Sequence, residues 1–442
     1  MTGRPAETGP ETVMSSDRSE PAAPSFQEAF GAWTRIGVTS FGGPAAQIAL
    51  MHKVIVEEKG WLSERGFLNA LNFCMLLPGP EAMQLATYAG WRLHGVAGGL
   101  AAGLMFVLPG AGVILALGLL YAYLGTVPLV SALFLGIKAA VLVIVIEALI
   151  KVARRALHEI GHWVIAGLAF VGIFFLDLPY PLLIAAFAVY GFFFSGTAGQ
   201  TEAQAVSPDV SLADTARTIV TWLAIWLVPL VAIDLATGGS ILGEIGWFFS
   251  TLAIVTFGGA YAVLAYMAQD VVNHFGWLTA GEMMDGLGLA ETTPGPLILV
   301  TQFVGFLSGF REGGVWLALA AALVTLWATF APCFLWIFAG APYIEWIGAQ
   351  PRLKGALSAI TAAVVGVILN LSVWFALHVF FSTVEPQRYG LVTVWQPDPA
   401  TLDWRVIVLA LVSGALLLWR GWTILPVLAI AAGLGVTLSL TT

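Results

Sequence analysis

The fold of this chain is decided by residues 41–80, FGGPAAQIALMHKVIVEEKGWLSERGFLNALNFCMLLPGP, and by residues 257–296, FGGAYAVLAYMAQDVVNHFGWLTAGEMMDGLGLAETTPGP, which align on them without a gap. The offset is 216 residues, and 14 of the 40 aligned positions are identical. The identities include the triplets Phe-Gly-Gly, Gly-Trp-Leu and Pro-Gly-Pro, and at the same offset Lys138 falls on Lys354. A chance register would not collect these matches, so the sequence predicts an internal duplication.

The composition indicates that both copies lie in a membrane. Of 442 residues, 59% are hydrophobic and 10% are charged, whereas about a quarter of an ordinary soluble domain is charged. About 12 apolar segments follow one another toward the C-terminus, many of them close to the ~20 residues that a helix needs to cross the hydrocarbon. The predicted fold class is an all-α polytopic membrane protein with two homologous repeats. The net charge of −8 provides no basic stripe for nucleic acid.

Polar stretches divide the chain. Residues 1–24 are rich in Pro, Ser, Thr and Glu and hold no apolar run that could direct secretion, which predicts a disordered cytoplasmic tail. Residues 196–217 have the composition of a linker between domains. The predicted first transporter repeat is therefore 25–195 and the second is 218–381, and they are followed by a C-terminal helical pair at 382–442 whose role the sequence leaves open.

The basic residues predict that the two repeats are inverted relative to each other. Lys53, Lys59, Arg65 and Arg92 accompany the first copy, while residues 218–310 contain six acids and neither Lys nor Arg. Basic residues gather in cytoplasmic loops, so the loops of the two copies are expected to face opposite sides of the membrane. Inverted repeats are typical of secondary transporters, whose substrate binds near the midplane where the repeats meet.

The Pro-Gly-Pro triplets predict a binding site at that meeting point. Proline lacks a backbone donor and keeps the preceding residue out of the α region, so each triplet breaks a helix. Broken backbone in a membrane must be packed in protein or line a cavity, and a helix that restarts there presents free N–H groups to an anion. A structural kink is the alternative, and the duplication favours a site. The backbone candidates are Gly42, Gly43, Pro78, Gly79, Pro80, Gly258, Gly259, Pro294, Gly295 and Pro296.

Charged residues in the apolar segments are the other candidates. Lys138 and Lys354 each lie near the start of an apolar helix, where they either snorkel to the headgroups or supply the positive charge that a dianion needs to leave water. For proton coupling the first choice is Glu291, because it precedes the second break, where desolvation would raise its pKa. Glu81 follows the first break and is the second choice.

A short metal motif offers an alternative function. His158-Glu159-Ile160-Gly161-His162 has the H-E-x-x-H pattern, which on a helix aligns two imidazoles for zinc and would suggest a membrane zinc peptidase. A glycine interrupts the pattern, a basic cluster adjoins it, and the remaining histidines suggest no third ligand. We interpret the match as accidental, and we expect neither a metal, nor a cofactor, nor an enzymatic activity.

With their flanking segments the two copies closely resemble the chromate ion transporter family over most of residues 25–381, in particular its long, two-domain members. Each half of those members carries a Phe-Gly-Gly and a Pro-Gly-Pro signature. Arg35 in WTRIGVTSFGG and Gln302 in VTQFVGF match the family pattern, whereas Glu81 departs from it, since a neutral Asn is expected there. The resemblance implies a bacterial plasma-membrane protein that exports chromate in exchange for protons and confers chromate resistance.

The expected mechanism is alternating access. Chromate would enter a midplane site from the cytoplasm, and protonation, with Glu291 as the carrier, would release it outward. The same site would serve uptake or exchange of sulfate or another tetrahedral oxyanion, so the direction stays open. The expected partners are the oxyanion, protons and the lipid bilayer, and the sequence does not decide whether the protein forms a homodimer.

Overall fold

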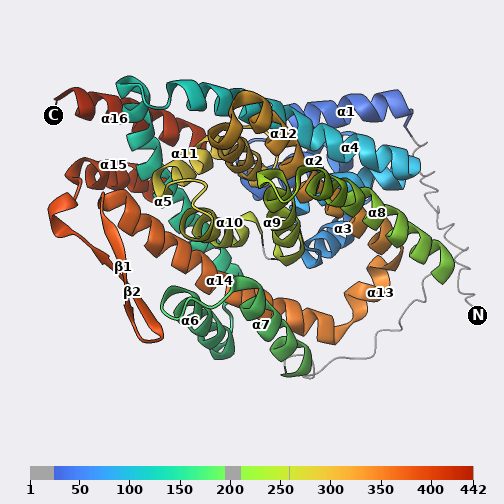
Figure 1. Ribbon diagram of the computed structural model, residues 1–442. Coiled ribbons are helices and arrows are strands. Elements are labelled where there is room, and N and C mark those ends of the chain that lie inside the picture. Colours follow the sequence, from blue (N-terminus) through green and yellow to red (C-terminus); the bar gives the residue numbers. More distant parts are fainter. Residues whose placement is uncertain (1–23, 195–210, 258, 442) are drawn as a thin grey trace, which may run out of the picture.

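The computed structural model describes residues 24–194, 211–257 and 259–441. The predicted tail up to residue 23, the last residue of the predicted first repeat together with positions 196–210 of the predicted linker, and the candidate Gly258 lie outside the described residues. The described chain is a bundle of helices with one two-stranded hairpin, as Figure 1 shows. The predicted helical class is therefore confirmed, and the hairpin is an element that the sequence analysis missed.

The main helices recur in the same order in the two halves of the chain, and the second half adds α13 and a β hairpin. The first half contains α1 (Phe26–Thr39), α2 (Gly43–His52), the π-helical η1 (Lys53–Glu58), α3 (Glu64–Leu76), α4 (Glu81–Leu124), α5 (Pro128–Ala156), α6 (Ile160–Phe174) and α7 (Tyr180–Phe194). After the connecting helix α8 (Leu212–Thr237), the second half contains α9 (Ile241–Val255), α10 (Ala260–Gln269), the π-helical η2 (Asp270–His274), α11 (Ala280–Glu291), η3 (Leu297–Leu299), α12 (Val300–Gly340), η4 (Ala341–Tyr343), α13 (Ile344–Ala349) and α14 (Pro351–Phe380). It ends with β1 (Val384–Tyr389), β2 (Val392–Pro397), η5 (Pro399–Thr401), α15 (Trp404–Gly414), η6 (Ala415–Trp419) and α16 (Ile424–Thr441).

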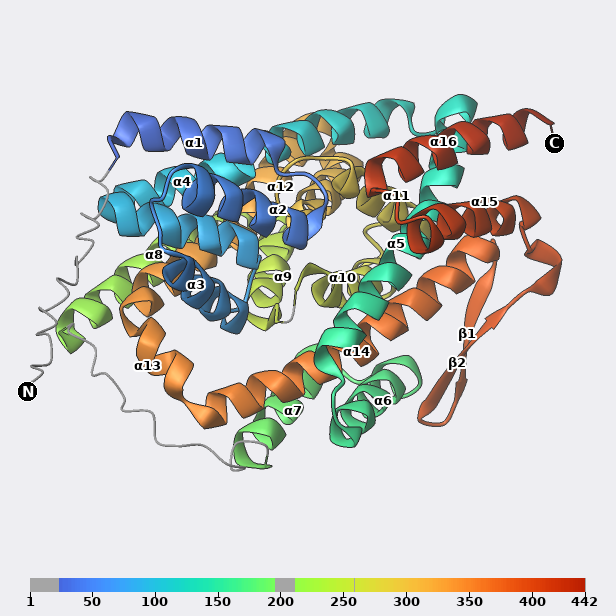
Figure 2. The same cartoon turned by 180° about the vertical axis from the view of Figure 1, so that it is seen from behind.

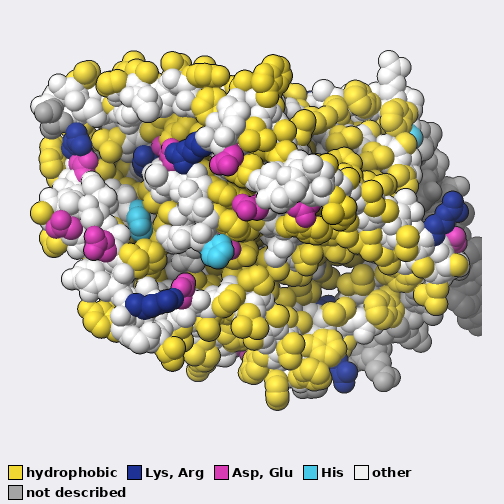
Figure 3. All heavy atoms as spheres, viewed as in Figure 1, with side chains coloured by type: hydrophobic (Ala, Val, Ile, Leu, Met, Phe, Trp, Pro, Cys, Tyr) yellow, Lys and Arg dark blue, Asp and Glu magenta, His cyan; other side chains and the backbone are white. Residues whose placement is uncertain are grey.

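The surface is that of a protein in lipid. Within the described part of the chain, six helices are long and apolar enough to cross a membrane. Hydrophobic side chains cover much of the face shown in Figure 3, and charged side chains gather in a few places. In α8 only 11% of the most apolar window is buried inside the protein, so the rest of this window needs an apolar solvent.

The two longest helices are hairpins rather than rods. α4 leaves helical geometry at His94 and Gly95, and α12 leaves it at Gly313 and Gly314. A Cβ placed on Gly90 would stand 2.3 Å from the carbonyl oxygen of Gly98, which is possible only if the chain doubles back between them. Small residues line both arms of each hairpin, and they allow the arms to approach closely.

The arms that flank the Pro-Gly-Pro breaks are too short to cross a bilayer. α3 has 13 residues, which span about 20 Å at 1.5 Å per residue, against a hydrocarbon core of about 30 Å. In the second half, Arg311 donates to the carbonyl of Trp277 and to the carboxylate of Glu282, just before and within the first turn of α11. The arms before and after the break therefore return to the same end of the protein, with the break at the tip of a re-entrant hairpin.

The last two helices of each half pack on the other half. α6 and α7 lie against α14, while α15 and α16 lie against α5, as Figure 2 shows from behind. The β hairpin joins these pairs, because the N–H of Thr393 in β2 donates to the carbonyl of Phe175 after α6 at 2.7 Å. The C-terminal pair thus occupies in the second half the place that α6 and α7 occupy in the first.

A pair of glycines in α16 tests this packing. A Cβ on Gly435 would stand 2.5 Å from the carbonyl oxygen of Ala132 in α5, whereas a Cβ on Gly433 would meet no described atom within 4 Å. We expect Gly435→Ala to destabilise the protein by about 1–3 kcal/mol through overpacking and Gly433→Ala to be neutral or slightly stabilising. Thermal unfolding of the two detergent-purified variants checks this, and equal melting temperatures would contradict the close approach of α16 to α5.

Candidate functional site

The two halves meet at their Pro-Gly-Pro breaks, which are the tips of the re-entrant hairpins. The same backbone contact occurs there twice, once from each half. The N–H of Gly79 donates to the carbonyl of Thr256, and the N–H of Gly295 donates to the carbonyl of Ser40, both at 2.8 Å. Ser40 and Thr256 are related by the same 216 residues as Gly79 and Gly295. Each Pro-Gly-Pro tip therefore contacts the residue that precedes the Phe-Gly-Gly triplet of the other half.

The chemistry of the breaks explains this contact. Gly79 and Gly295 have φ values of 118° and 87°, which only glycine adopts readily, and their amides have left the helix. An unpaired amide buried in a membrane protein costs several kcal/mol, so each tip takes its partner from the opposite half. Gln47 also donates to the carbonyl of Gly295 at 2.6 Å, and Gln84 donates to the carbonyl of Pro78 at 2.7 Å. The polar backbone at the centre is thus paired within the protein.

Neither restarted helix offers an open anion cradle. α4 begins with Glu81, whose carboxylate already lies at the positive end of that helix. The second break is followed by Leu297, Ile298 and Leu299, and all three are buried. The carbonyl of Pro294 is also closely packed, because a Cβ on Gly110 of α4 would stand 2.1 Å from its oxygen.

A cavity of about 200 Å³ lies beside α11 instead of at the breaks. It has room for a tetrahedral oxyanion and several waters. Its wall is formed where the end of α4 and the first part of α5 face the N-terminal turns of α11. The lining residues are Tyr121, Gly125, Ser131, Phe134, Lys138, Thr279, Gly281, Glu282 and Asp285.

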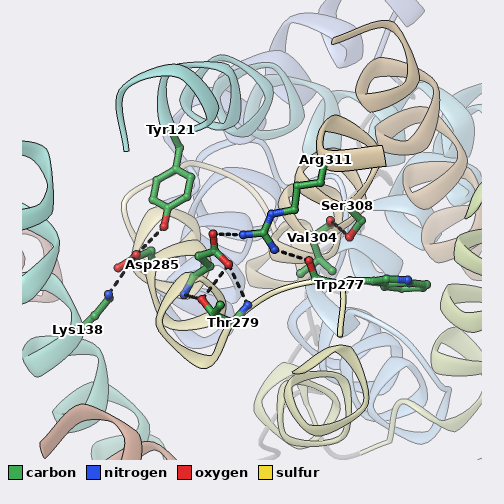
Figure 4. Close-up of polar contacts among 9 residues, drawn as sticks. Tyr121, Lys138, Trp277, Thr279, Asp285, Val304, Ser308 and Arg311 are labelled. Carbon is green, nitrogen blue, oxygen red and sulfur yellow. Dashed lines mark hydrogen bonds and ion pairs between the residues drawn. The ribbon is translucent and has the colours of Figure 1, made fainter. Parts of the chain in front are cut away.

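An ion pair inside this cavity joins the halves. Lys138 Nζ lies 3.3 Å from Asp285 Oδ2, and the Tyr121 hydroxyl donates to the same oxygen at 2.7 Å. Asp285 is only 3% exposed, and its Oδ1 has no hydrogen-bond partner among the described residues. Figure 4 shows Lys138 and Tyr121 pointing at Asp285 from α5 and α4. Lys138 stands ten residues into α5, about 15 Å from the start of this 29-residue helix.

A second ion pair closes the start of α11. Glu282 accepts from the N–H and hydroxyl of Thr279, both at 2.8 Å, in a capping box. Arg311 binds the other oxygen of Glu282. The cavity region therefore holds two cations and two carboxylates, so an anion that enters it meets no net positive charge.

The structure separates the two lysines that the duplication pairs. Lys354 is exposed in the first turn of α14, while Lys138 lies deep in α5. The offset of 216 residues holds up to the Pro-Gly-Pro breaks, but Gly95 and Gly314 are 219 residues apart and α5 and α14 begin 223 residues apart. Extra residues in the second half thus remove the register on which the lysine match depended.

The other predicted substrate residues lie elsewhere. Arg35 is exposed and pairs with Glu58 at 2.9 Å, near the base of the first hairpin. Gln302 is buried and donates to the carbonyl of Ala111 at 3.1 Å. Gly42, Gly43 and Gly259 form the tips that precede α2 and α10. Pro78, Gly79, Pro80, Pro294, Gly295 and Pro296 form the central contact between the halves.

The two predicted proton carriers lie outside the cavity lining. Glu291, at the end of α11, is 5% exposed and accepts from the Tyr261 hydroxyl at 2.7 Å. Glu81 is half-buried at the start of α4. The acid that faces a cation in the cavity is Asp285, which the sequence analysis did not single out. The sequence does carry a sign of it, because Asp285 is one of six acids in residues 218–310, which contain neither Lys nor Arg. An acid buried in such a stretch requires a cationic partner from another part of the chain.

The zinc motif lacks the helical geometry that it needs. α5 ends at Ala156 and α6 begins at Ile160, so His158 lies in the connection and Glu159 occupies the N-cap position of α6. The Nε2 of His162 lies 3.1 Å from the Ser358 hydroxyl. Across the described ranges, no group of three or more His, Cys, Asp or Glu side chains could hold a metal ion.

Two copies of a re-entrant unit that meet at the centre, with an ion-paired cavity between apolar helices, define a polytopic membrane transport protein. The family model described as Chromate transporter matches residues 27–192 and 243–436. The chain belongs to the chromate transporter family, as its resemblance predicted.

Relatives of full and of half length support this assignment. The chain is 29% identical over 425 residues to the "Chromate transport protein" of Pseudomonas aeruginosa, covering 92% of this chain and 94% of the relative. It is 28% identical over 400 residues to the "Probable chromate transport protein" of Synechococcus elongatus, covering 86% and 93%. The "Uncharacterized transporter YwrB" of Bacillus subtilis is 30% identical over 182 residues, which is 38% of this chain and 87% of that protein. No solved structure matches significantly.

Proposed function

We propose that this protein exports chromate across the bacterial plasma membrane by alternating access, driven by the proton-motive force, and so confers chromate resistance. The observation that carries the proposal is the reciprocal pair of hydrogen bonds between Gly79 and Thr256 and between Gly295 and Ser40. Two equivalent units joined through equivalent contacts can exchange roles, which turns an outward-open cavity into an inward-open one. Membership of the chromate transporter family supports chromate as the substrate.

The proposed repeats are inverted and include the terminal helices. The first runs from α1 to α7 and the second from α9 to α16, because the same element order recurs and the family match extends to residue 436. α8 is long and apolar enough to cross the membrane between them, and the absence of Lys and Arg from residues 218–310 supports the opposite orientation of the second repeat. The basic cluster of Lys151, Arg154 and Arg155 ends α5 and marks the cytoplasmic side, while the cavity lies toward the opposite, outer end of that helix.

Everted membrane vesicles test this proposal. Respiration makes the interior of such vesicles positive and acidic, so an exporter should accumulate chromate inside them. We expect chromate to accumulate inside these vesicles and accumulation to stop when an uncoupler collapses the proton gradient. Vesicles without the protein should not accumulate chromate. Chromate movement that ignores the gradient would contradict the proposal, and an excess of sulfate in the assay reports how far the site accepts a related dianion.

The Lys138–Asp285 pair favours a second candidate, which is uptake of sulfate or another tetrahedral oxyanion. A carboxylate that must be neutralised before an anion reaches the lysine tends to make proton and anion travel together. Right-side-out vesicles separate the two candidates. Uptake driven by an inward proton gradient in these vesicles, without accumulation in everted ones, would reverse the direction and keep the site.

A further inference from the structure

We propose that Asp285 and the transported oxyanion compete for Lys138, so that the oxyanion enters the cavity together with a proton that Asp285 takes up. This inference rests on the proposed function and assigns its proton site to a residue other than Glu291. It also implies positive coupling between the two ligands, because binding of the proton favours binding of the oxyanion and the reverse.

The hydrogen bonds of Asp285 leave it free to change partner. Its Oδ2 is held only by the side chains of Lys138 and Tyr121, at 3.3 and 2.7 Å. Its Oδ1 is buried and unpartnered among the residues that the structure describes. A buried ionised carboxylate oxygen without a donor is costly, and a proton on the group removes the buried charge. The neutral carboxyl group would then donate a hydrogen bond to an oxyanion on Lys138.

The neighbouring carboxylate is fixed where Asp285 is not. Glu282 accepts from the backbone of Thr279, from its hydroxyl and from Arg311. Removing its charge would weaken these hydrogen bonds and leave Arg311 without its ionised partner. The charged and titratable groups that face Asp285 are Lys138 from α5, Tyr121 from α4, Glu282 from α11 itself and, across Glu282, Arg311 from α12. Three donors hold the ionised form of Glu282, whereas two side chains hold that of Asp285, so Asp285 is the carboxylate that loses its charge more readily.

Charge balance sets the order of events. With Asp285 ionised, the two cations and two carboxylates cancel, and a dianion that left water here would have no compensating charge. With Asp285 neutral, Lys138 is uncovered and the region carries one positive charge beside the N-terminal amides of α11. Binding of the oxyanion and protonation of Asp285 are thus linked with positive sign.

This sign differs from the antiport that the sequence suggested, because exchange of chromate for protons requires the two to exclude each other. A chromate dianion that leaves with one proton still carries net negative charge outward. The membrane potential, inside negative, drives that movement, so export would draw on the electrical component of the proton-motive force.

The test is chromate affinity of the detergent-purified full chain at several pH values, measured by titration calorimetry for the wild type and for Asp285→Asn. Chromate itself takes up a proton near neutral pH, but this affects both proteins equally, so the difference between their slopes is the readout. We expect the chromate affinity of the wild type to fall as the pH rises. For each pH unit this fall should be up to about tenfold larger than that of Asp285→Asn. At high pH the variant should bind more tightly than the wild type, since no carboxylate competes.

Two further variants sharpen the outcome. Asp177→Asn makes the same chemical change at an exposed acid outside the cavity lining, where the φ of 52° suits Asn, and it should keep the wild-type slope. Parallel slopes for wild type and Asp285→Asn would overturn the inference while leaving chromate transport intact. A slope lost in Glu291→Gln instead would overturn it in favour of Glu291. Absence of chromate binding by the folded wild type would remove the proposed function and this inference with it.

Discussion

Gly110→Ala should abolish chromate transport and strongly destabilise the protein, whereas Gly112→Ala, two residues further along α4, should leave transport unchanged and stability slightly higher. A Cβ on Gly110 would stand 2.1 Å from the carbonyl oxygen of Pro294 and 2.6 Å from Leu299 Cδ1. The Pro294 carbonyl belongs to the break whose next residue, Gly295, donates to Ser40. The added methyl group therefore has to push apart the contact that joins the two halves.

The expected destabilisation is about 3 kcal/mol, at the upper end of what overpacking costs, because the obstacle is backbone that cannot change rotamer. Gly112 faces outward and has no described atom within 4 Å of its would-be Cβ, so an alanine there should gain roughly 0.5–1 kcal/mol of helix propensity. Thermal unfolding of both variants and vesicle transport of chromate measure the difference. If the two variants behave alike, α4 does not hold the second break in the way described.

Lys138→Met should eliminate chromate transport, and Lys354→Met should retain it. Lys138 lines the cavity and is paired with Asp285, while Lys354 is exposed at the start of α14. Methionine keeps most of the length and apolar contact of the lysine stem but brings no charge for the oxyanion. Loss of the only cation that touches Asp285 in the described structure should reduce transport at least a hundredfold, since a dianion cannot be desolvated without a counter-charge.

Vesicle transport measured at matched protein amounts separates the two lysines. Lys138→Met leaves Asp285 unpaired, and this acid can become neutral, so the variant should still fold. Combination with Asp285→Asn is the control, because it removes the unpaired carboxylate and should restore any lost thermal stability without restoring transport. Equal loss in Lys138→Met and Lys354→Met would favour the symmetric pair of lysines that the duplication suggests over the asymmetric cavity.

Much of the architecture could be predicted because it is encoded locally. Apolar length and low charge require a membrane, and a helix cannot run through Pro-Gly-Pro whatever surrounds it. The duplication can be recognised in the sequence because both copies need the same backbone geometry. Glycine and proline are nearly the only residues that adopt this geometry, so they are identical in the two copies. The β hairpin was missed because a short exposed hairpin leaves little pattern, and Thr393 finds its partner at Phe175, which is far away in the chain.

The site could be predicted only in part, since charge pairing is a property of the folded chain. Lys138 stood out as a charge in an apolar segment, but its partner lies 147 residues away and nothing local connects the two. The match with Lys354 did not predict an equivalent position in the structure. Beyond the breaks the second half carries additional residues, so an offset of 216 no longer relates equivalent positions.

The sequence by itself therefore determined that this protein is a duplicated helical membrane protein of the chromate transporter family with a broken helix in each half. Only the tertiary structure decided that the breaks pack against each other through paired backbone and that the cavity opens beside α11, between Lys138, Tyr121 and Asp285. The physical reason is the distance along the chain over which each interaction acts. Helix breaking and hydrophobicity act between neighbours in the chain, whereas an ion pair buried in apolar surroundings forms wherever the fold brings two opposite charges together.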